Sequence, residues 1–277
     1  MVCNMDFTID KYKQLLQALN EAGYDSVLRF SDTLKRQVLL RHDVDARPQN
    51  SLVTARIESE RGMNAIYYFR AVSGSWEEGT IREIAVLGHE IGYHYESLTT
   101  CKGDMDLAYK DFCTHYDRLN QLLGHQVKTI CMHGSPRSVH DSRDIWKKYD
   151  YKELGIDYEP YFDTDWSRTV YLTDTGRCWD GWRMSVRDKI EGWQEQWESK
   201  GLRFHHTDDI IDFLYSDKAS SPREVSRLLI TTHPQRWNST KWGWFKELVM
   251  QNAKNQVKKY LGRKTTEPEF SGRDNNQ

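Results

Sequence analysis

The chain has 277 residues, of which 38% are hydrophobic and 29% charged, and its formal net charge is −2. This length and balance are typical of a globular protein that can bury a core, and the lack of a basic excess argues against a nucleic-acid partner. No apolar run approaches the roughly 20 residues that cross a bilayer, so the sequence predicts no membrane span.

Helical and extended patterns alternate along the chain. Spacing of apolar residues, caps and glycine stops predicts helices over about 8–22, 48–62, 77–87, 105–123, 210–215 and 242–260. Short apolar runs predict strands over about 38–40, 65–69, 90–94, 127–132, 169–172, 202–206 and 228–232. This repeated order predicts an α/β fold with a largely parallel sheet.

The most informative motif is His42-Asp43-Val44-Asp45, which comes directly after a predicted strand. Residues two apart on a strand point to the same side, so Asp43 and Asp45 are expected to project together from its carboxyl end. Two adjacent carboxylates resist joint ionisation unless a cation lies nearby or they divide the roles of ligand and base. The alternative is that these residues only form a turn or a helix cap.

Two later strands end in histidine. His94 closes the predicted strand that begins at Glu90, and His233 follows the apolar run from Leu228 to Thr232, where Pro234 stops the strand pattern. A single histidine is more often a hydrogen-bonded structural residue than a ligand. Because three strands deliver Asp, His and His at the same type of position, we expect a shared site.

These motifs resemble those of the polysaccharide deacetylases, a group of metal-dependent carbohydrate esterases (family 4) with the NodB-homology fold, and the chain looks like a divergent member of the cytoplasmic type. The resemblance covers roughly residues 38 to 240. It implies that the sheet closes into an irregular (β/α) barrel of about seven parallel strands. It also implies that Asp43 is the general base, Asp45 and His94 are metal ligands, and His233 is the general acid.

The resemblance extends to two substrate-binding segments. The segment from Met132 to Arg137 is similar to the family's third motif, and Asp163-Thr164-Asp165-Trp166 is similar to the fourth. The family pattern therefore predicts that Arg137, Asp165 and Trp166 contact the substrate.

One position departs from the family pattern. The second metal-binding histidine of the family stands four residues after the first, where this chain has Leu98. The family site needs three protein ligands plus water, with Zn²⁺ as the expected divalent ion. Glu96 and His133 are both candidates for the missing third ligand, the first because it lies two residues from His94 and the second because it ends a strand.

The implied activity is hydrolysis of an N-acyl, typically N-acetyl, group from a sugar or sugar conjugate. Two alternatives stay open at this point: a non-catalytic carbohydrate-binding protein on the same fold, which Leu98 favours, and hydrolysis of another non-peptide C–N bond. The expected partner is a small-molecule or glycan substrate, and the sequence does not indicate an oligomeric state.

Domain organisation and location are predicted from simple signals. We expect one barrel domain with an N-terminal helix over residues 1–264 and a disordered polar tail over 265–277. The chain has five cysteines at scattered spacing, including Cys131 in a predicted core strand, which is typical of reduced thiols. With no secretory signal pattern in the first residues, we expect a cytoplasmic protein.

Overall fold

The structure is a computed structural model that describes residues 5–135, 138–185, 187–216 and 225–250. The predicted tail at 265–277, Arg137 and the last part of the helix predicted over 242–260 therefore lie outside the described residues. None of the helices in the described ranges is both long enough and apolar enough to cross a membrane.

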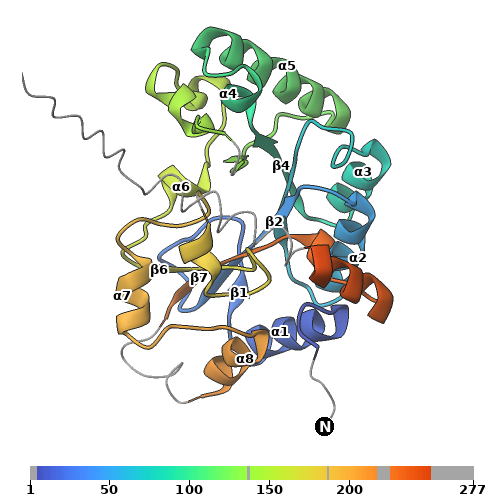
Figure 1. Ribbon diagram of the computed structural model, residues 1–277, viewed down its shortest axis with the longest axis vertical. Coiled ribbons are helices and arrows are strands. Elements are labelled where there is room, and N and C mark those ends of the chain that lie inside the picture. Colours follow the sequence, from blue (N-terminus) through green and yellow to red (C-terminus); the bar gives the residue numbers. More distant parts are fainter. Residues whose placement is uncertain (1–4, 136–137, 186, 217–224, 251–277) are drawn as a thin grey trace, which may run out of the picture.

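Strands and helices alternate as predicted (Figure 1). The strands are β1 (Asp25–Ser26), β2 (Gln37–Val44), β3 (Ala65–Phe69), β4 (Glu90–Tyr95), β5 (Ile130–Met132), β6 (Thr169–Thr173) and β7 (Arg227–Thr232). The helices are α1 (Ile9–Glu21), α2 (Pro48–Ser59), α3 (Glu78–Val86), α4 (Ser97–Thr100), α5 (Met105–Leu123), α6 (Pro160–Asp163), α7 (Gln194–Ser199) and α8 (Thr207–Tyr215). Residues 241–250 are also helical.

All strand pairs are parallel and form one seven-stranded sheet. The order is β5-β4-β3-β2-β7-β6, and the short β1 pairs with the start of β2. The sheet curls, with helices α1, α2, α3 and α5 forming an arc outside it (Figure 1). Within the described ranges no strand pairing joins β5 to β6, so the predicted α/β barrel is confirmed as an open one.

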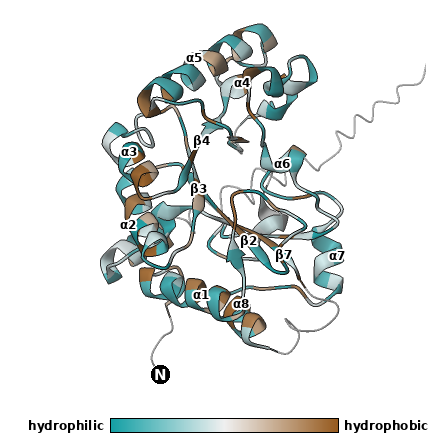
Figure 2. Ribbon diagram, turned by 180° about the vertical axis from the view of Figure 1, so that it is seen from behind, coloured by the Kyte–Doolittle hydropathy of each residue, from teal (hydrophilic) through white to brown (hydrophobic). Residues whose placement is uncertain are grey.

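Helix caps and apolar spacing explain the outer layer. Thr8 caps α1, and Leu15, Leu16 and Leu19 of that helix are buried. Gly124 ends α5 in the left-handed conformation that glycine adopts without steric cost. Hydrophobic residues concentrate on the strands, while hydrophilic residues cover much of the outer surface of the helices (Figure 2). The core thus lies between the curled sheet and the helical arc.

One predicted strand is wrong. Residues 202–206 form no strand, because they lead into α8 and cap it. The backbone N–H groups of His205 and His206 both donate to Asp209 Oδ2, at 2.8 Å each. The segment before a helix often has extended backbone, which is why the sequence of Leu202 to His206 resembles a strand. The backbone N–H groups of His205 and His206 bond to the start of the helix and not to a neighbouring strand.

Strand β2 separates two polar environments. All eight of its residues are buried, including Arg41, His42 and Asp43. Side chains alternate across a sheet, so Arg41 and Asp43 share the inner, concave face. His42 points to the other face, where its Nε2 lies 2.7 Å from the buried carboxylate of Glu58 on α2. The inner face at the carboxyl end of β2 is therefore the surface on which a site is built.

Candidate active site at the carboxyl ends of the strands

Asp43 is held in a buried ion pair at the end of β2. Arg41 donates from Nε to Oδ1 at 2.8 Å and from Nη2 to Oδ2 at 2.6 Å. Burial alone would raise the pKa of Asp43, but the charges of Arg41 and the nearby His94 outweigh it and hold this pKa well below its usual range. The Asp43 carboxylate therefore stays ionised at any physiological pH.

Asp45, just beyond the end of β2, has an unsatisfied carboxylate oxygen. Oδ2 accepts from Gln235 Nε2 at 3.3 Å, but Oδ1 is buried with no hydrogen-bond partner among the described residues. This atom lies 3.4 Å from His133 Nε2 and 3.8 Å from His94 Nε2. A buried acceptor without a donor is costly, and it is expected where an ion completes the structure.

His94 is arranged to accept a ligand. It lies on β4, and its Nδ1 is 2.8 Å from the Cys131 carbonyl oxygen, which can only accept a hydrogen bond. Nδ1 is therefore the donor, and Nε2 of the neutral ring keeps its lone pair toward Asp45. Burial is the main reason that the pKa of His94 falls to about 4, so the neutral form prevails at neutral pH.

His133 is oriented by a carboxylate in the same way. Its Nδ1 lies 3.0 Å from Glu96 Oε2, and Glu96 in turn accepts from Arg70 Nε and Nη2 at 3.0 and 2.7 Å. Burial would raise the pKa of Glu96, but His133 and Arg70 together lower it to about 2. A carboxylate that fixes the far nitrogen of a histidine is the usual support of a metal-binding imidazole. Glu96 thus faces His133 and Arg70, and His133 faces Asp45.

His233 lies across the same space, directly after β7. Its Nδ1 is 2.6 Å from Asp174 Oδ1, and its Nε2 is 3.9 Å from Asp45 Oδ2. Burial and Arg236 lower the pKa of His233, but the charge and hydrogen bond of Asp174 exceed them and raise it above its ordinary value. His233 therefore holds a proton to higher pH than a free histidine.

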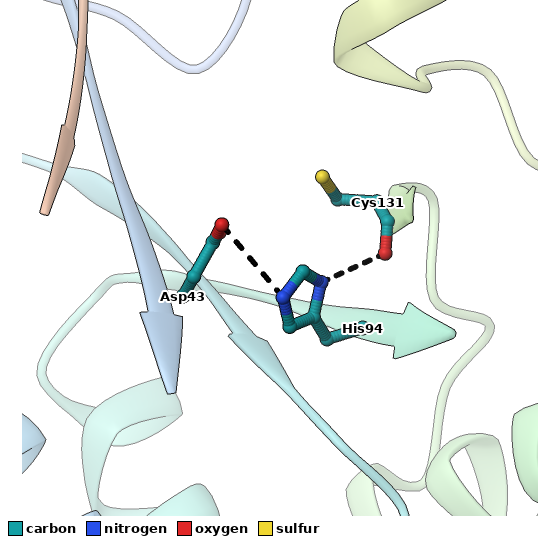
Figure 3. Close-up of side chains that lie close together, drawn as sticks. All are labelled: Asp43, His94 and Cys131. Carbon is teal, nitrogen blue, oxygen red and sulfur yellow. Dashed lines mark hydrogen bonds and ion pairs between the residues drawn. The ribbon is translucent and has the colours of Figure 1, made fainter. Parts of the chain in front are cut away.

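Two donor sets around His94 differ in their fit to a metal ion. Asp43, His94 and Cys131 place one donor atom each within 4.8 Å of one another, with Asp43 and Cys131 on either side of the imidazole (Figure 3). However, both oxygens of Asp43 already bind Arg41, and burial raises the pKa of the Cys131 thiol well above its usual range, so it stays protonated.

The second set, Asp45, His94 and His133, has freer donor atoms, although among the described residues only the first set has all three donor atoms within 4.8 Å of one another. It offers a free carboxylate oxygen and two oriented lone pairs. Two donors around a tetrahedral zinc ion are roughly 3.3 Å apart, given metal–ligand distances of about 2.0–2.1 Å. The distances of Asp45 Oδ1 to the two histidines approach this value.

The residues implied by the third and fourth motifs are spread more widely. Asp45, His94, His133 and His233 line one cavity of about 360 Å³. Asp165 is exposed and only closes a turn by accepting from Ser167, so the structure does not bring it to this cavity. Trp166 is half-buried and lines a neighbouring hollow. The substrate contacts expected of Arg137, Asp165 and Trp166 stay predictions, and Arg137 is outside the described residues.

Asp174 is the residue that sequence reasoning missed. Its segment resembles a simple turn, yet the carboxylate is fully buried and also accepts from Arg236 Nη1 at 2.6 Å and Trp237 Nε1 at 2.8 Å. One signal was present: Asp174 directly follows β6, as Asp45 follows β2. A carboxylate at the end of one strand and a histidine at the end of its neighbour, β7, are expected to meet.

Comparisons with known proteins give structural likeness without close sequence relatives. No family model matches the sequence, and no curated protein matches it either. Among solved structures, it is similar to BA3943, a pseudoenzyme of carbohydrate esterase family 4 from Bacillus anthracis (10% identity, TM-score 0.44, 84% of this chain and 64% of that one). The chain thus spans less than two thirds of that protein.

Two further similar structures carry the same family's name. One is a family 4 carbohydrate esterase from Bacillus anthracis, at 12% identity and TM-score 0.42, over 91% of this chain and 86% of that one. The other is PdaA of Bacillus subtilis, also a family 4 carbohydrate esterase, at 12% identity and TM-score 0.40, over 87% and 84%. These are members of the group that the sequence motifs resemble. At such identities and TM-scores they assign no activity to this chain.

Proposed function

We propose that the protein is a metal-dependent hydrolase that removes an acyl group from the nitrogen of an N-acylated amino sugar. The observation that carries the proposal is the buried, unpartnered Oδ1 of Asp45, which lies between the lone pairs of His94 and His133 and across the cavity from the Asp174–His233 pair. The sequence motifs support the same activity.

Asp45, His94 and His133 are the residues that would hold the metal. A bound divalent cation, with Zn²⁺ expected, supplies a Lewis acid that polarises an amide carbonyl and lowers the pKa of water. The protein's own part is to orient the two imidazoles, His94 through the Cys131 carbonyl and His133 through Glu96.

Asp43 is the proposed proton acceptor. Its carboxylate lines the cavity and is ionised, as a general base must be. When the oxygen of a water molecule bonds to the carbonyl carbon, one proton of that water passes to Asp43. The double hydrogen bond from Arg41 fixes the carboxylate in position but also weakens it as a base.

His233 is the proposed proton donor. Because Asp174 raises the pKa of His233, this histidine can give a proton to the amide nitrogen as the C–N bond breaks, and the leaving group departs as a neutral amine. The products are a carboxylic acid, acetate for an N-acetyl group, and a free amino sugar. The cavity volume of about 360 Å³ is near the low end of ligand pockets, which suits a single sugar unit.

One observation favours a second function, binding of a carbohydrate without cleavage. Arg41 occupies both oxygens of Asp43, so the proposed base accepts a proton only by weakening a buried ion pair. A chain that has lost catalysis would tolerate such a pair.

Acetate release separates the two functions. The protein is purified without a histidine tag, loaded with zinc or cobalt, and assayed against a panel of N-acetylated sugars and their conjugates. Acetate release that depends on Asp43 and His233 supports the hydrolase. Saturable sugar binding with no release across the panel, with metal bound, would favour the binding protein.

A further inference from the structure

A second hollow adjoins the catalytic cavity. It has a volume of about 300 Å³ and lies on the other side of Tyr161 and Arg187, which line both spaces. The side chain of Arg187 crosses Gly134, the residue after His133, where an added Cβ would lie 3.0 Å from Arg187 Cβ. The second hollow is therefore an extension of the same site, reached past the proposed metal ligand His133.

Cations dominate the lining of this hollow. Arg143, Arg187 and Lys189 line it together with a single carboxylate, that of the exposed Glu191. Asp141, beside the hollow, accepts from both Arg143 and Arg187, at 2.6 and 3.1 Å, so one negative charge serves two guanidinium groups. Asp188 lines the catalytic cavity and accepts from Tyr161 and other hydroxyl groups, so cations outnumber carboxylates in the lining of the second hollow itself.

Two of these cations have unused donors. Arg187 Nε is buried with no hydrogen-bond partner among the described residues, although its two terminal nitrogens donate to Asp141 and Ser138. Lys189 is half-buried and forms no ion pair within the described part of the chain. Unmet donors on half-buried cations are expected where an anionic ligand provides the missing acceptors.

The hollow also has aromatic residues in its lining. Trp166 and Trp193 line it, and each is half-buried. Flat aromatic faces stack on planar or apolar groups such as nucleobases and sugar faces. The second hollow thus combines positive charge with aromatic rings next to the catalytic cavity.

We propose that the N-acylated sugar carries a phosphate group and that Arg187 and Lys189 bind this phosphate while the acyl group lies at Asp45. This inference rests on the proposed function and specifies its substrate class. A phosphate presents several strong acceptor oxygens and up to two negative charges, which suits a guanidinium and an ammonium better than a neutral sugar does.

The phosphate can belong to a simple sugar phosphate or to a nucleotide-linked sugar. Both share the chemistry that Arg187 and Lys189 recognise, and the aromatic residues distinguish them. If a nucleotide follows the phosphate, Trp166 and Trp193 are placed to stack on its base.

Calorimetry tests the phosphate site directly. N-acetylglucosamine, N-acetylglucosamine 1-phosphate and UDP-N-acetylglucosamine are titrated into the whole protein at constant ionic strength, with Zn²⁺ present. We expect the phosphorylated sugar to bind about tenfold or more tightly than the plain sugar, the effect of one charge-assisted hydrogen bond. In Lys189→Gln and in Arg187→Gln this preference should shrink to about threefold or less.

Control variants make the outcome decisive. Arg82→Gln removes an exposed cation from α3 and should keep the full preference. Lys189→Gln breaks no hydrogen bond or ion pair within the described residues, so it tests the site even if Arg187→Gln perturbs the fold. Equal binding of plain and phosphorylated sugar by the wild type, or an unchanged preference in both site variants, overturns the proposal.

The remaining comparisons separate this inference from the proposed function. If UDP-N-acetylglucosamine binds more tightly than N-acetylglucosamine 1-phosphate, and Trp193→Ala removes this difference in affinity, the phosphate belongs to a nucleotide. If the two ligands bind with equal affinity, it belongs to a sugar phosphate. Phosphate-dependent binding without acetate release refutes the hydrolase and supports the phosphate site. Acetate release from plain and phosphorylated sugars with equal KM refutes the phosphate site alone.

Discussion

Two histidines from different strands approach a single oxygen atom, Asp45 Oδ1, at the end of a third strand. His94 comes from β4 and His133 follows β5, while Asp45 follows β2. In the proposed function, His133 supplies the third donor that Leu98 does not offer. Leu98 is buried against Ala108 and Ile145 in a small apolar cluster of its own. Leu98 therefore takes no part in the proposed donor set.

The first prediction concerns this third donor. His133→Ala should abolish zinc binding or weaken it strongly, because two protein donors remain of three. Calorimetry on the metal-stripped protein measures the loss, and Ala at the exposed His125 is the matched control. Unchanged zinc affinity in His133→Ala would contradict the assignment of His133 as a ligand.

A companion variant tests the apolar role of Leu98. Leu98→His should not tighten metal binding, because its side chain lies among Ala108 and Ile145. Burying an imidazole there should cost about 2 kcal/mol or more in the free energy of unfolding, from lost packing and an unpaired polar group. Urea denaturation measures it. Tighter zinc binding with unchanged stability would show instead that position 98 reaches the metal site.

The second prediction concerns the acid. Asp174→Asn removes the charge that raises the pKa of His233, so His233 should lose its proton at lower pH. The alkaline limb of the rate profile should then move to lower pH, and the rate at neutral pH should fall on the order of 10²–10⁴, the usual range for a general acid. Zinc content should be unchanged. If the rate fell but the alkaline limb of the pH–rate profile stayed at the same pH, Asp174 would have a purely structural role.

The sequence predicted which single residues lie at strand ends, but it did not predict which side chains they hydrogen-bond to. Asp43, Asp45, His94 and His233 follow apolar runs, which sequence shows directly. The pairs Glu96–His133 and Asp174–His233 join residues 37 and 59 positions apart. Such contacts depend on which strands are neighbours in the sheet. No local sequence pattern predicts that β6 pairs with β7.

At the scale of elements, a glycine fixes the packing of β4 against its neighbours. Gly92 lies two residues before His94 and faces the ring of Tyr68 on β3. A Cβ at this position would lie 2.4 Å from Tyr68 Cδ1 and 2.5 Å from Cε1. Tyr68 is fully buried and hydrogen-bonded to Thr129 at 2.6 Å, so it has little room to move.

The third prediction follows from that contact. Gly92→Ala should destabilise the protein by roughly 1–3 kcal/mol, the usual cost of overpacking a core. Denaturant unfolding measures the effect. Gly124→Ala, where nothing lies within 4 Å but φ is positive, is a control for backbone strain without a clash. Tyr68→Ala removes the clashing ring, so if this change relieved none of the Gly92→Ala cost, the clash would not be its cause.

Helices were more predictable than strands. The helix expected over 105–123 is observed as α5 with the same bounds, because Asp104, the apolar spacing and Gly124 all agree. The strand expected over 127–132 is shortened to β5, and the one over 202–206 is absent. Short apolar runs carry no capping information, so tertiary context decides whether they pair.

Over the whole molecule, burial of ionisable groups links stability to pH. Glu159 is fully buried and accepts from the backbone of Met132 and Tyr161, at 3.1 and 2.7 Å. Burial raises its pKa from the ordinary 4.5 to about 7, even though these hydrogen bonds and two arginines oppose the rise. A group whose pKa is raised on folding favours the protonated, low-pH form.

The fourth prediction is a loss of stability as pH rises through this range. Glu159 should contribute its full stabilising effect below about pH 4.5 and lose on the order of 3 kcal/mol by pH 7 and above. Glu159→Gln, which stays neutral, should flatten this part of the curve. Urea midpoints at pH 5 and pH 8 for both proteins measure the difference. If stability changed equally between pH 5 and pH 8 in the two proteins, Glu159 would not titrate in this range.

Metal binding should also stabilise the whole fold, because the three proposed donors lie on or directly after three different strands, β2, β4 and β5. An ion that binds only the folded state adds about 2.7 kcal/mol at one hundred times its Kd. The fifth prediction is that Zn²⁺ raises Tm and that a chelator reverses the rise. Asp43→Asn should keep this response, because Asp43 binds Arg41 and is not a donor in the proposed set. Asp45→Asn should lose it. If Asp43→Asn abolished the response and Asp45→Asn retained it, the set of Asp43, His94 and Cys131 would be the metal site.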